Sequence, residues 1–149
     1  MQLTRAADYA VRVMIHFGAC PPGARITRTA LAKATGVPED FLAKVLQALA
    51  RAGLVLSRRG LDGGFVLRAD STKISLVDVI EAIDGPMAVN VCLMSGNSCE
   101  RQGECPAHTL WGRAQTAMLK VLRSASIADL AAQAAANRKR RPAAVRGDT

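Results

Sequence analysis

Apolar residues recur at helical spacing near the start of the chain and predict a first helix. They are Leu3, Ala6, Ala7, Ala10, Val11, Val13, Met14 and Phe17. Thr4 is placed to cap this helix and Gly18 to end it, because a hydroxyl can accept from free backbone N–H groups and glycine tolerates the turn that follows.

Two further apolar patterns follow within 30 residues. A short helix is predicted over residues 27–35, ended by Gly36, and Pro38 is expected to open a longer helix with an apolar stripe over residues 41–49. A short helix, a turn and a longer helix are the helix-turn-helix pattern.

After Gly53 the pattern becomes β-like. Residues 54–60 and 64–68 are short β-prone runs on either side of a glycine-rich segment, which predicts a hairpin. A hairpin directly after a helix-turn-helix is a wing, so the order of the pieces predicts a winged helix.

The second half returns to helical spacing. Ser75 and Asp78 resemble a capping box that starts a helix ending at Gly85, and a long helix is expected from Pro106 to about Arg123. The long helix carries more apolar surface than one face needs to hide, which fits a dimer contact or ordinary core packing. An alanine-rich helix over residues 126–136 comes last.

The fold class expected is therefore mostly α: a winged helix-turn-helix with a small β-hairpin wing, plus a long C-terminal dimerisation helix. We divide the chain into a winged-helix DNA-binding domain (1–70), a cluster-binding loop with dimerisation helices (71–136) and a disordered basic tail (137–149). A length of 149 residues suits one such unit.

Composition supports this class and narrows the compartment. Half of the residues are hydrophobic but only 3% are aromatic, as in helices packed through small aliphatic side chains. No apolar run approaches the roughly 20 residues that span a bilayer, and the first residues lack the layout of a signal peptide. We expect a cytoplasmic protein with no membrane partner.

The net charge of +8 is unevenly distributed. Residues 1–70 hold ten Lys and Arg against five Asp and Glu, residues 71–136 hold five against six, and residues 137–149 hold five against one. A basic first half is expected where a protein meets a polyanion, and double-stranded DNA fits a winged helix.

Three of the four cysteines lie in one short, polar stretch. Cys92, Cys99 and Cys105 have C-x6-C-x5-C spacing, and His108 follows. In a reducing compartment such thiols favour metal or redox chemistry over structural disulfides. Structural zinc usually uses paired C-x2-C knuckles, which this stretch lacks, and a cluster-free thiol switch is a further alternative.

With these motifs in order, the chain resembles the Rrf family of bacterial transcription regulators, which includes NsrR and IscR. The resemblance runs almost end to end. It includes the openings 1–5 and 8–12, Gly53 to Val55, Arg58 to Gly60, Gly63 and Gly64 of the wing, residues 74–83 and the three cysteines.

The resemblance implies a homodimer that reads a palindromic operator and whose DNA affinity is set by an iron-sulfur cluster on the three cysteines. It leaves open whether nitric oxide, iron supply or redox stress is sensed. The fourth ligand would be Asp8, as in NsrR-type clusters that take it from the partner subunit, or His108, as in IscR-type clusters. We favour Asp8 with a [4Fe-4S] cluster and keep [2Fe-2S] as the alternative.

Both fourth-ligand candidates have simpler interpretations. Asp8 is spaced to pair with Arg5 or Arg12 along a helix, and His108 is placed to cap or to pack beside Trp111.

The helix-turn-helix and the wing also predict which residues meet DNA. The helix opening at Pro38 should enter the major groove, with Glu39, Asp40 and Lys44 as its polar residues. The two acids either accept from cytosine amino groups or complement the helix dipole. Nearer the phosphates are the residues Thr27, Arg28 and Thr29 of the preceding helix, with Arg58 and Arg59 on the wing.

No enzyme is expected. A thiol enzyme using Cys105 and His108 would need a nucleotide loop, an oxyanion arrangement or an acid pair, and no such motif is recognisable. An iron-sulfur carrier without a promoter is the remaining alternative class.

Overall fold

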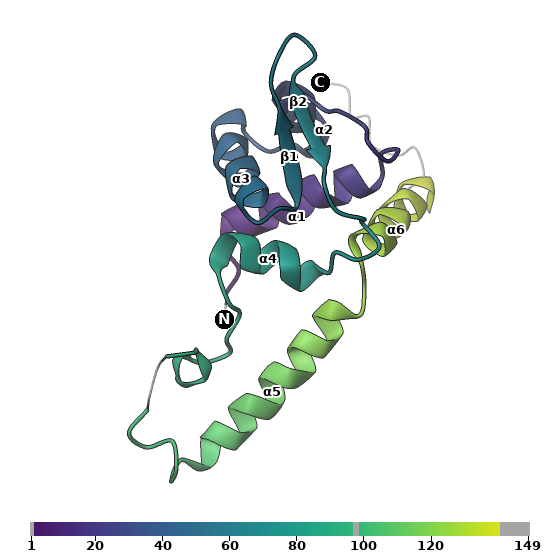
Figure 1. Cartoon of the computed structure of the whole chain (residues 1–149). Coiled ribbons are helices and arrows are strands. Elements are labelled where there is room, and N and C mark those ends of the chain that lie inside the picture. The colour runs from purple at the N-terminus through teal and green to yellow at the C-terminus, as the bar shows by residue number, and fades with distance from the viewer. Residues whose placement is uncertain (1, 97–98, 141–149) are drawn as a thin grey trace, which may run out of the picture.

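The structure is a computed structural model that describes residues 2–96 and 99–140 (Figure 1). Within these residues it is mostly helical, with one two-stranded antiparallel hairpin. The elements are α1 Arg5–Gly18, α2 Arg28–Thr35, α3 Glu39–Arg51, β1 Val55–Arg58, β2 Gly64–Leu67, α4 Leu76–Asp84, η1 Val91–Leu93, α5 Pro106–Arg123 and α6 Ile127–Arg140. The predicted fold class is confirmed.

Side-chain caps begin four of these helices, α1, α2, α4 and α6, at or within one residue of the starts that the sequence predicted. The Thr4 hydroxyl accepts from the Ala7 amide at 3.1 Å. Ser75 and Asp78 form a complete capping box at the start of α4. Because each cap satisfies backbone N–H groups that have no partner inside the helix, it fixes where the helix begins.

Helix α1 lies at the centre of the fold and packs against α2, α3, α4 and α6 (Figure 1). Ala7 and Ala10 are fully buried and allow neighbouring helices to approach closely. At the other end of α1, a Cβ atom added to Gly18 would lie 2.9 Å from the Ile127 side chain. The end of α1 and the start of α6 are therefore in close contact.

The main core draws residues from both halves of the sequence. Ile74, Val79 and Ile127 join residues of α1, α2, α3 and β1 in one buried cluster. The predicted DNA-binding domain thus packs on residues beyond position 70, and the division of the chain at that position stays a prediction.

The hairpin pairs Val55 with Leu67 at its base and Arg58 with Gly64 near its tip. Ile26, just before α2, forms an additional antiparallel bridge to Phe65, with N–H to O distances of 3.0 and 2.8 Å. We call residues 54–68 the wing. This bridge fixes β2 of the wing, close to its tip, to the segment just before α2.

Helix α6 differs from its prediction. It starts at Ile127, one residue after the expected position, and continues to Arg140, four residues into the segment expected to be disordered. Alanine favours helix, and the three basic residues of the last turn, Arg138, Lys139 and Arg140, interact favourably with the helix dipole. Residues 141–149 of the predicted tail lie outside the described residues.

None of the described helices combines the length and hydrophobicity needed to cross a membrane.

Replacing Ile127 with Ala should destabilise the protein by about 3 kcal/mol, because it removes buried methyl groups and leaves a cavity against α1. Urea unfolding followed by circular dichroism measures this. Gln133→Ala, at an exposed position of the same helix, should change stability by less than about 0.5 kcal/mol. Equal stability of the two variants would contradict the packing of α6 described above.

Candidate nucleic-acid interface and cysteine loop

Helix α3 has one buried and one open face. Leu42, Val45, Leu46 and Leu49 are buried, whereas Glu39, Asp40 and Lys44 are exposed. The open polar face can therefore reach a partner without unpacking the core. Pro38 is the N-cap residue of α3, in line with the predicted start of this helix; it makes no side-chain cap bond, and the helical residues begin at Glu39.

The acids at the start of α3 are partly balanced. Glu39 lies 3.8 Å from the Arg28 guanidinium, and both side chains are about half exposed. An exposed ion pair of this kind contributes at most about 1 kcal/mol, so Arg28 can leave it for a phosphate. Thr27 caps α2 by accepting from the Ala30 amide at 3.2 Å, and Thr29 is exposed in the first turn.

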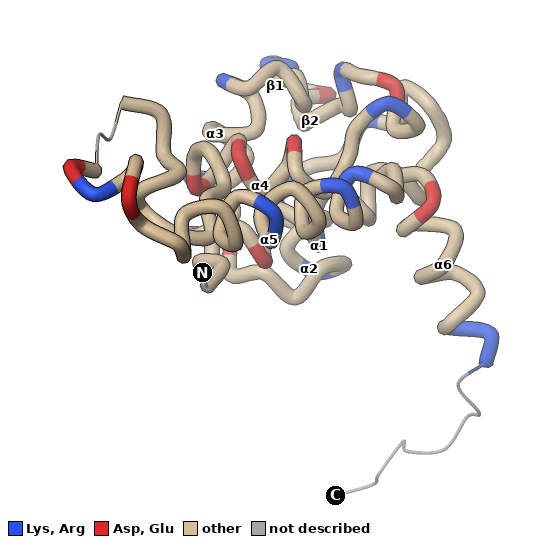
Figure 2. Tube along the Cα trace, turned by 90° about the horizontal axis from the view of Figure 1, so that it is seen from below, with Lys and Arg blue, Asp and Glu red and all other residues tan. Residues whose placement is uncertain are grey.

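The wing and the helix-turn-helix share an open hollow of about 370 Å³. It is lined by Thr27, Arg28, Thr29, Ala43, Gly63, Gly64 and Phe65. Arg58 ends β1 and Arg59 begins the turn, and both are exposed. Figure 2 shows Lys and Arg positions at the wing. The structure thus brings the predicted phosphate contacts of α2 next to the wing, while their contact with DNA stays a prediction.

The cysteine loop, residues 86–105, connects α4 to α5. Cys92 lies in η1, Cys99 is exposed and Cys105 is the residue immediately before α5. Figure 1 shows the start of α5 far from the body of the fold, with the helix running back towards it. None of the three cysteines belongs to either buried cluster, so the described structure gives these thiols no packing role.

The donor set of this loop suits an iron-sulfur cluster in chemical type, because soft thiolates are the preferred ligands of such iron. In the arrangement of a single chain the site is not closed. Among residues 2–96 and 99–140, no three His, Cys, Asp or Glu side chains gather as a metal site. A cluster would therefore require the loop to close further.

Asp8, the favoured fourth ligand, already has a partner. Its carboxylate lies 2.7 Å from the Arg12 guanidinium, and both side chains are 51% exposed. The simpler interpretation of Asp8 as a helical ion-pair partner is thus present in the structure. His108 lies in the first turn of α5, and its backbone N–H donates to the Cys105 carbonyl at 3.2 Å.

The sequence alone did not reveal a contact that joins this ion pair to α3. The Arg12 guanidinium lies 5.7 Å from the centre of the Tyr9 ring, and that ring meets Phe41 of α3 edge-on, with centroids 5.8 Å apart. Phe41 was predicted in the apolar stripe of α3, yet it is 47% exposed. The aromatic type of both residues was the available signal, but their pairing required the packing of α1 on α3.

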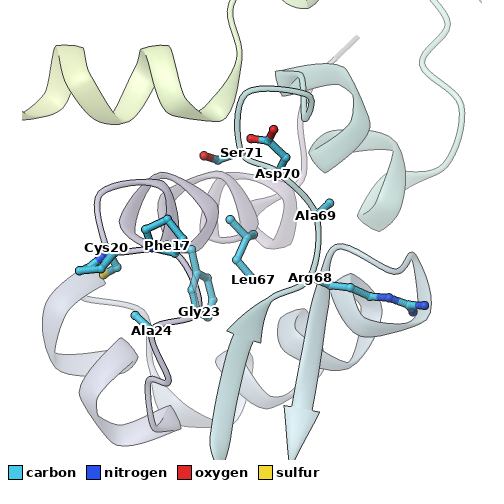
Figure 3. Close-up of a pocket in the computed structure, with 11 residues that line it drawn as sticks. Phe17, Cys20, Gly23, Ala24, Leu67, Arg68, Ala69, Asp70 and Ser71 are labelled. Atoms are coloured by element: carbon cyan, nitrogen blue, oxygen red, sulfur yellow. The ribbon is translucent and has the colours of Figure 1, made fainter.

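The fourth cysteine borders a separate hollow. Cys20, Phe17, Leu67 and the neighbouring loops line a volume of about 440 Å³ at the end of α1 opposite to Asp8 (Figure 3). The Cys20 Sγ lies 4.0 Å from Nε2 of His16. Burial, followed by the nearby Arg138 cation, lowers the pKa of His16 below its ordinary value of 6.5. Cys20 is therefore separate from the cysteine loop, as the sequence suggested.

Comparisons with known proteins agree with this architecture. The Rrf2 family model, described as an iron-dependent transcriptional regulator, matches residues 3–133. Protein Aau3 of Rhizobium meliloti is 36% identical over 132 residues, covering 87% of this chain and 84% of that protein.

Solved structures show the same fold. CymR, the global cysteine regulator of B. subtilis, is 26% identical with a TM-score of 0.72 over 89% of this chain and 98% of that one. IscR of T. potens, at 21% identity, has a TM-score of 0.69 over 95% of this chain and 93% of that one.

The environment of His16 predicts that the stability of the folded protein depends on pH. Because the folded state lowers its pKa, the unfolded chain binds a proton more readily, so stability should be fully present above pH 6.5 and decline as pH falls below it. In His16→Gln the decline in the free energy of unfolding between pH 7.5 and 5.5, measured in urea, should be smaller. An identical decline in both proteins would contradict this role of His16.

Proposed function

Because the chain belongs to the Rrf2 family of transcriptional regulators, we propose that it is a homodimeric repressor whose grip on a palindromic operator is set by an iron-sulfur cluster. Membership of this family of transcriptional regulators also confirms that the chain is not an enzyme. The observation that carries the cluster proposal is the cysteine loop: three thiols, one exposed and two half-buried, lie outside both buried clusters in one segment between α4 and α5.

The apolar face of α5 supports the dimer. None of its 18 residues is buried, and Leu110, Trp111 and Val121 are 60%, 40% and 68% exposed. An exposed apolar stripe of this size is stabilised when another surface covers it. A second copy of the same helix provides that surface and brings two winged helices to two half-sites.

Cys92, Cys99 and Cys105 would hold the cluster, with Asp8 of the second copy as the favoured fourth ligand. When bound, a [4Fe-4S] cluster with a weak carboxylate ligand supplies an iron that nitric oxide can reach. His108 with a [2Fe-2S] cluster is the alternative, and it suits redox sensing by an IscR-like regulator of iron-sulfur assembly genes.

Asp8 would connect the proposed cluster to helix α3. A carboxylate that serves as a ligand has to loosen its 2.7 Å ion pair with Arg12, and Arg12 in turn lies over Tyr9, which meets Phe41 of α3. Gain or loss of the ligand thus changes the partners of residues that touch the reading helix. Such a two-state contact is what energetic coupling between the two sites requires.

The second candidate is a cluster-free repressor switched by thiol oxidation. It is favoured by the likeness to the cysteine regulator CymR. It is also favoured because no three His, Cys, Asp or Glu side chains lie together as a metal site among the described residues. In both cases the operator contacts are those predicted for α2, α3 and the wing.

Cysteine variants separate the two candidates. Wild-type protein purified without oxygen should contain iron and absorb visible light, whereas Cys92→Ser, Cys99→Ser and Cys105→Ser should each retain less than a tenth of the iron. Cys20→Ser is the matched control and should retain all of it, because Cys20 lies at the far end of α1.

The DNA readout accompanies this measurement. Removing iron from the wild type should change its affinity for a duplex selected from a random pool at least tenfold, measured by fluorescence anisotropy. Iron-free wild type that binds as tightly as the loaded form would overturn the cluster switch and favour the thiol-oxidation candidate.

Mixed dimers identify the fourth ligand and its subunit. In a dimer of Asp8→Ala with Cys105→Ser, a ligand from the partner leaves one complete site per dimer, whereas a ligand from the same chain leaves none. We expect this mixed dimer to show about half of the wild-type visible absorption of the cluster. That absorption should change on addition of nitric oxide.

The matched control is the dimer of His108→Ala with Cys105→Ser. If His108 is a bystander, this dimer also keeps one complete site. Loss of cluster in the control, together with full retention by Asp8→Ala homodimers, would replace Asp8 by His108 as the ligand.

A further inference from the structure

Leu61 is exposed without any contact that explains its apolar character. Its relative exposure is 109%, whereas Val121, the next most exposed large apolar residue described, reaches 68%. Several of the other exposed apolar residues lie on α5 or the cysteine loop, where a second copy is proposed to cover them. Leu61 lies instead at the apex of the wing.

The tip that carries Leu61, residues 59–63, is a built turn. The Gly63 amide donates to the Gly60 carbonyl at 2.9 Å, which makes Leu61 and Asp62 the two central residues of the turn. Gly60 has a φ of 112°, which a side chain would disfavour. A Cβ on Gly63 would lie 2.8 Å from the Gly60 carbonyl oxygen, so the turn depends on both glycines.

The body of the protein braces this turn. The Arg25 guanidinium donates to the Asp62 carbonyl at 2.5 Å, and the Ile26 bridge to Phe65 holds the strand that follows. Leu61 is therefore presented from a support with fixed contacts to the segment before α2. An apolar side chain held in this way can enter a binding partner at a defined position, and its backbone loses little conformational freedom on binding.

Two arginines and one carboxylate lie near Leu61 on the wing. Arg58 and Arg59 precede it, Asp62 follows it, and all three are exposed. Gly63 and Gly64, at the tip side of the wing, line one hollow with Arg28. Figure 2 shows Lys and Arg positions on this part of the wing. An apolar tip preceded by two arginines matches the minor groove of A·T-rich DNA, which combines apolar sugar walls with a strongly negative potential.

We propose that Leu61 enters the DNA minor groove beside the site read by α3, as an apolar wedge preceded by Arg58 and Arg59. The inference rests on the proposed operator binding and adds a base-pair preference to it. Because Leu61 carries no charge, it contributes to affinity without neutralising a phosphate. A guanine amino group in the minor groove would clash with it, so A·T pairs are preferred at that position.

Three substitutions separate a wedge from a charge effect. Leu61→Gln keeps the size but loses the apolar character, and it should weaken binding to a duplex selected from a random pool by the wild type about fivefold to tenfold. Leu61→Met keeps the apolar character and should stay within twofold of the wild type. Arg59→Gln should reduce the slope of log affinity against log salt by about one, whereas Leu61→Gln should leave the slope unchanged.

Base-pair replacement tests whether Leu61 enters the minor groove. Changing the A·T pairs that flank the α3 half-site to G·C adds an amino group to the minor groove, and changing them to I·C alters the major groove alone. G·C should weaken wild-type binding, I·C should not, and Leu61→Gln should respond to G·C less than the wild type does. Equal responses of wild type and Leu61→Gln would overturn the proposal.

Failure of this inference differs from failure of the proposed function. A wild type that selects no duplex from the pool contradicts operator binding itself. A wild type that binds its selected duplex, with Leu61→Gln as tight, contradicts the wedge and leaves operator binding standing.

Discussion

The close packing of small residues along α1 is the constraint on which the rest of the structure depends. Ala7 and Ala10 are fully buried, and Gly18 leaves no room for a Cβ atom beside Ile127. Larger side chains at these positions would push apart the helices that surround α1. The same helix therefore supports α3 on one side and α4 and α6 on others, and it carries Asp8 and Tyr9 on its remaining surface.

Two parts of the single chain are incomplete, and one event would complete both. Leu110, Trp111 and Val121 of α5 are exposed, and the cysteine loop does not gather three donors among the described residues. Pairing of two copies through α5 would bury the apolar stripe and bring a second α1 into the same assembly. In the proposed dimer, oligomerisation and the supply of the fourth ligand would be parts of one arrangement.

Signals that are local in sequence predicted the fold well. Thr4, Thr27 and the Ser75 and Asp78 capping box each fix a helix start through contacts within three residues, and the glycines mark the turns. Contacts between distant residues were less visible: the edge-on pair of Tyr9 and Phe41 depends on how two helices pack. The choice between Arg12 and a cluster as the partner of Asp8 depends on a second chain, which one sequence does not describe.

The sharing of the core between the two ends of the sequence also affects how the protein is made. The buried cluster under the helix-turn-helix includes Ile74, Val79 and Ile127. During synthesis the first 70 residues leave the ribosome well before Ile127 does, and until then their core lacks part of its cover. The winged helix is thus completed only when the cysteine loop and α5 have already emerged, so a nascent chain acquires its DNA-binding unit and its proposed sensor at nearly the same time.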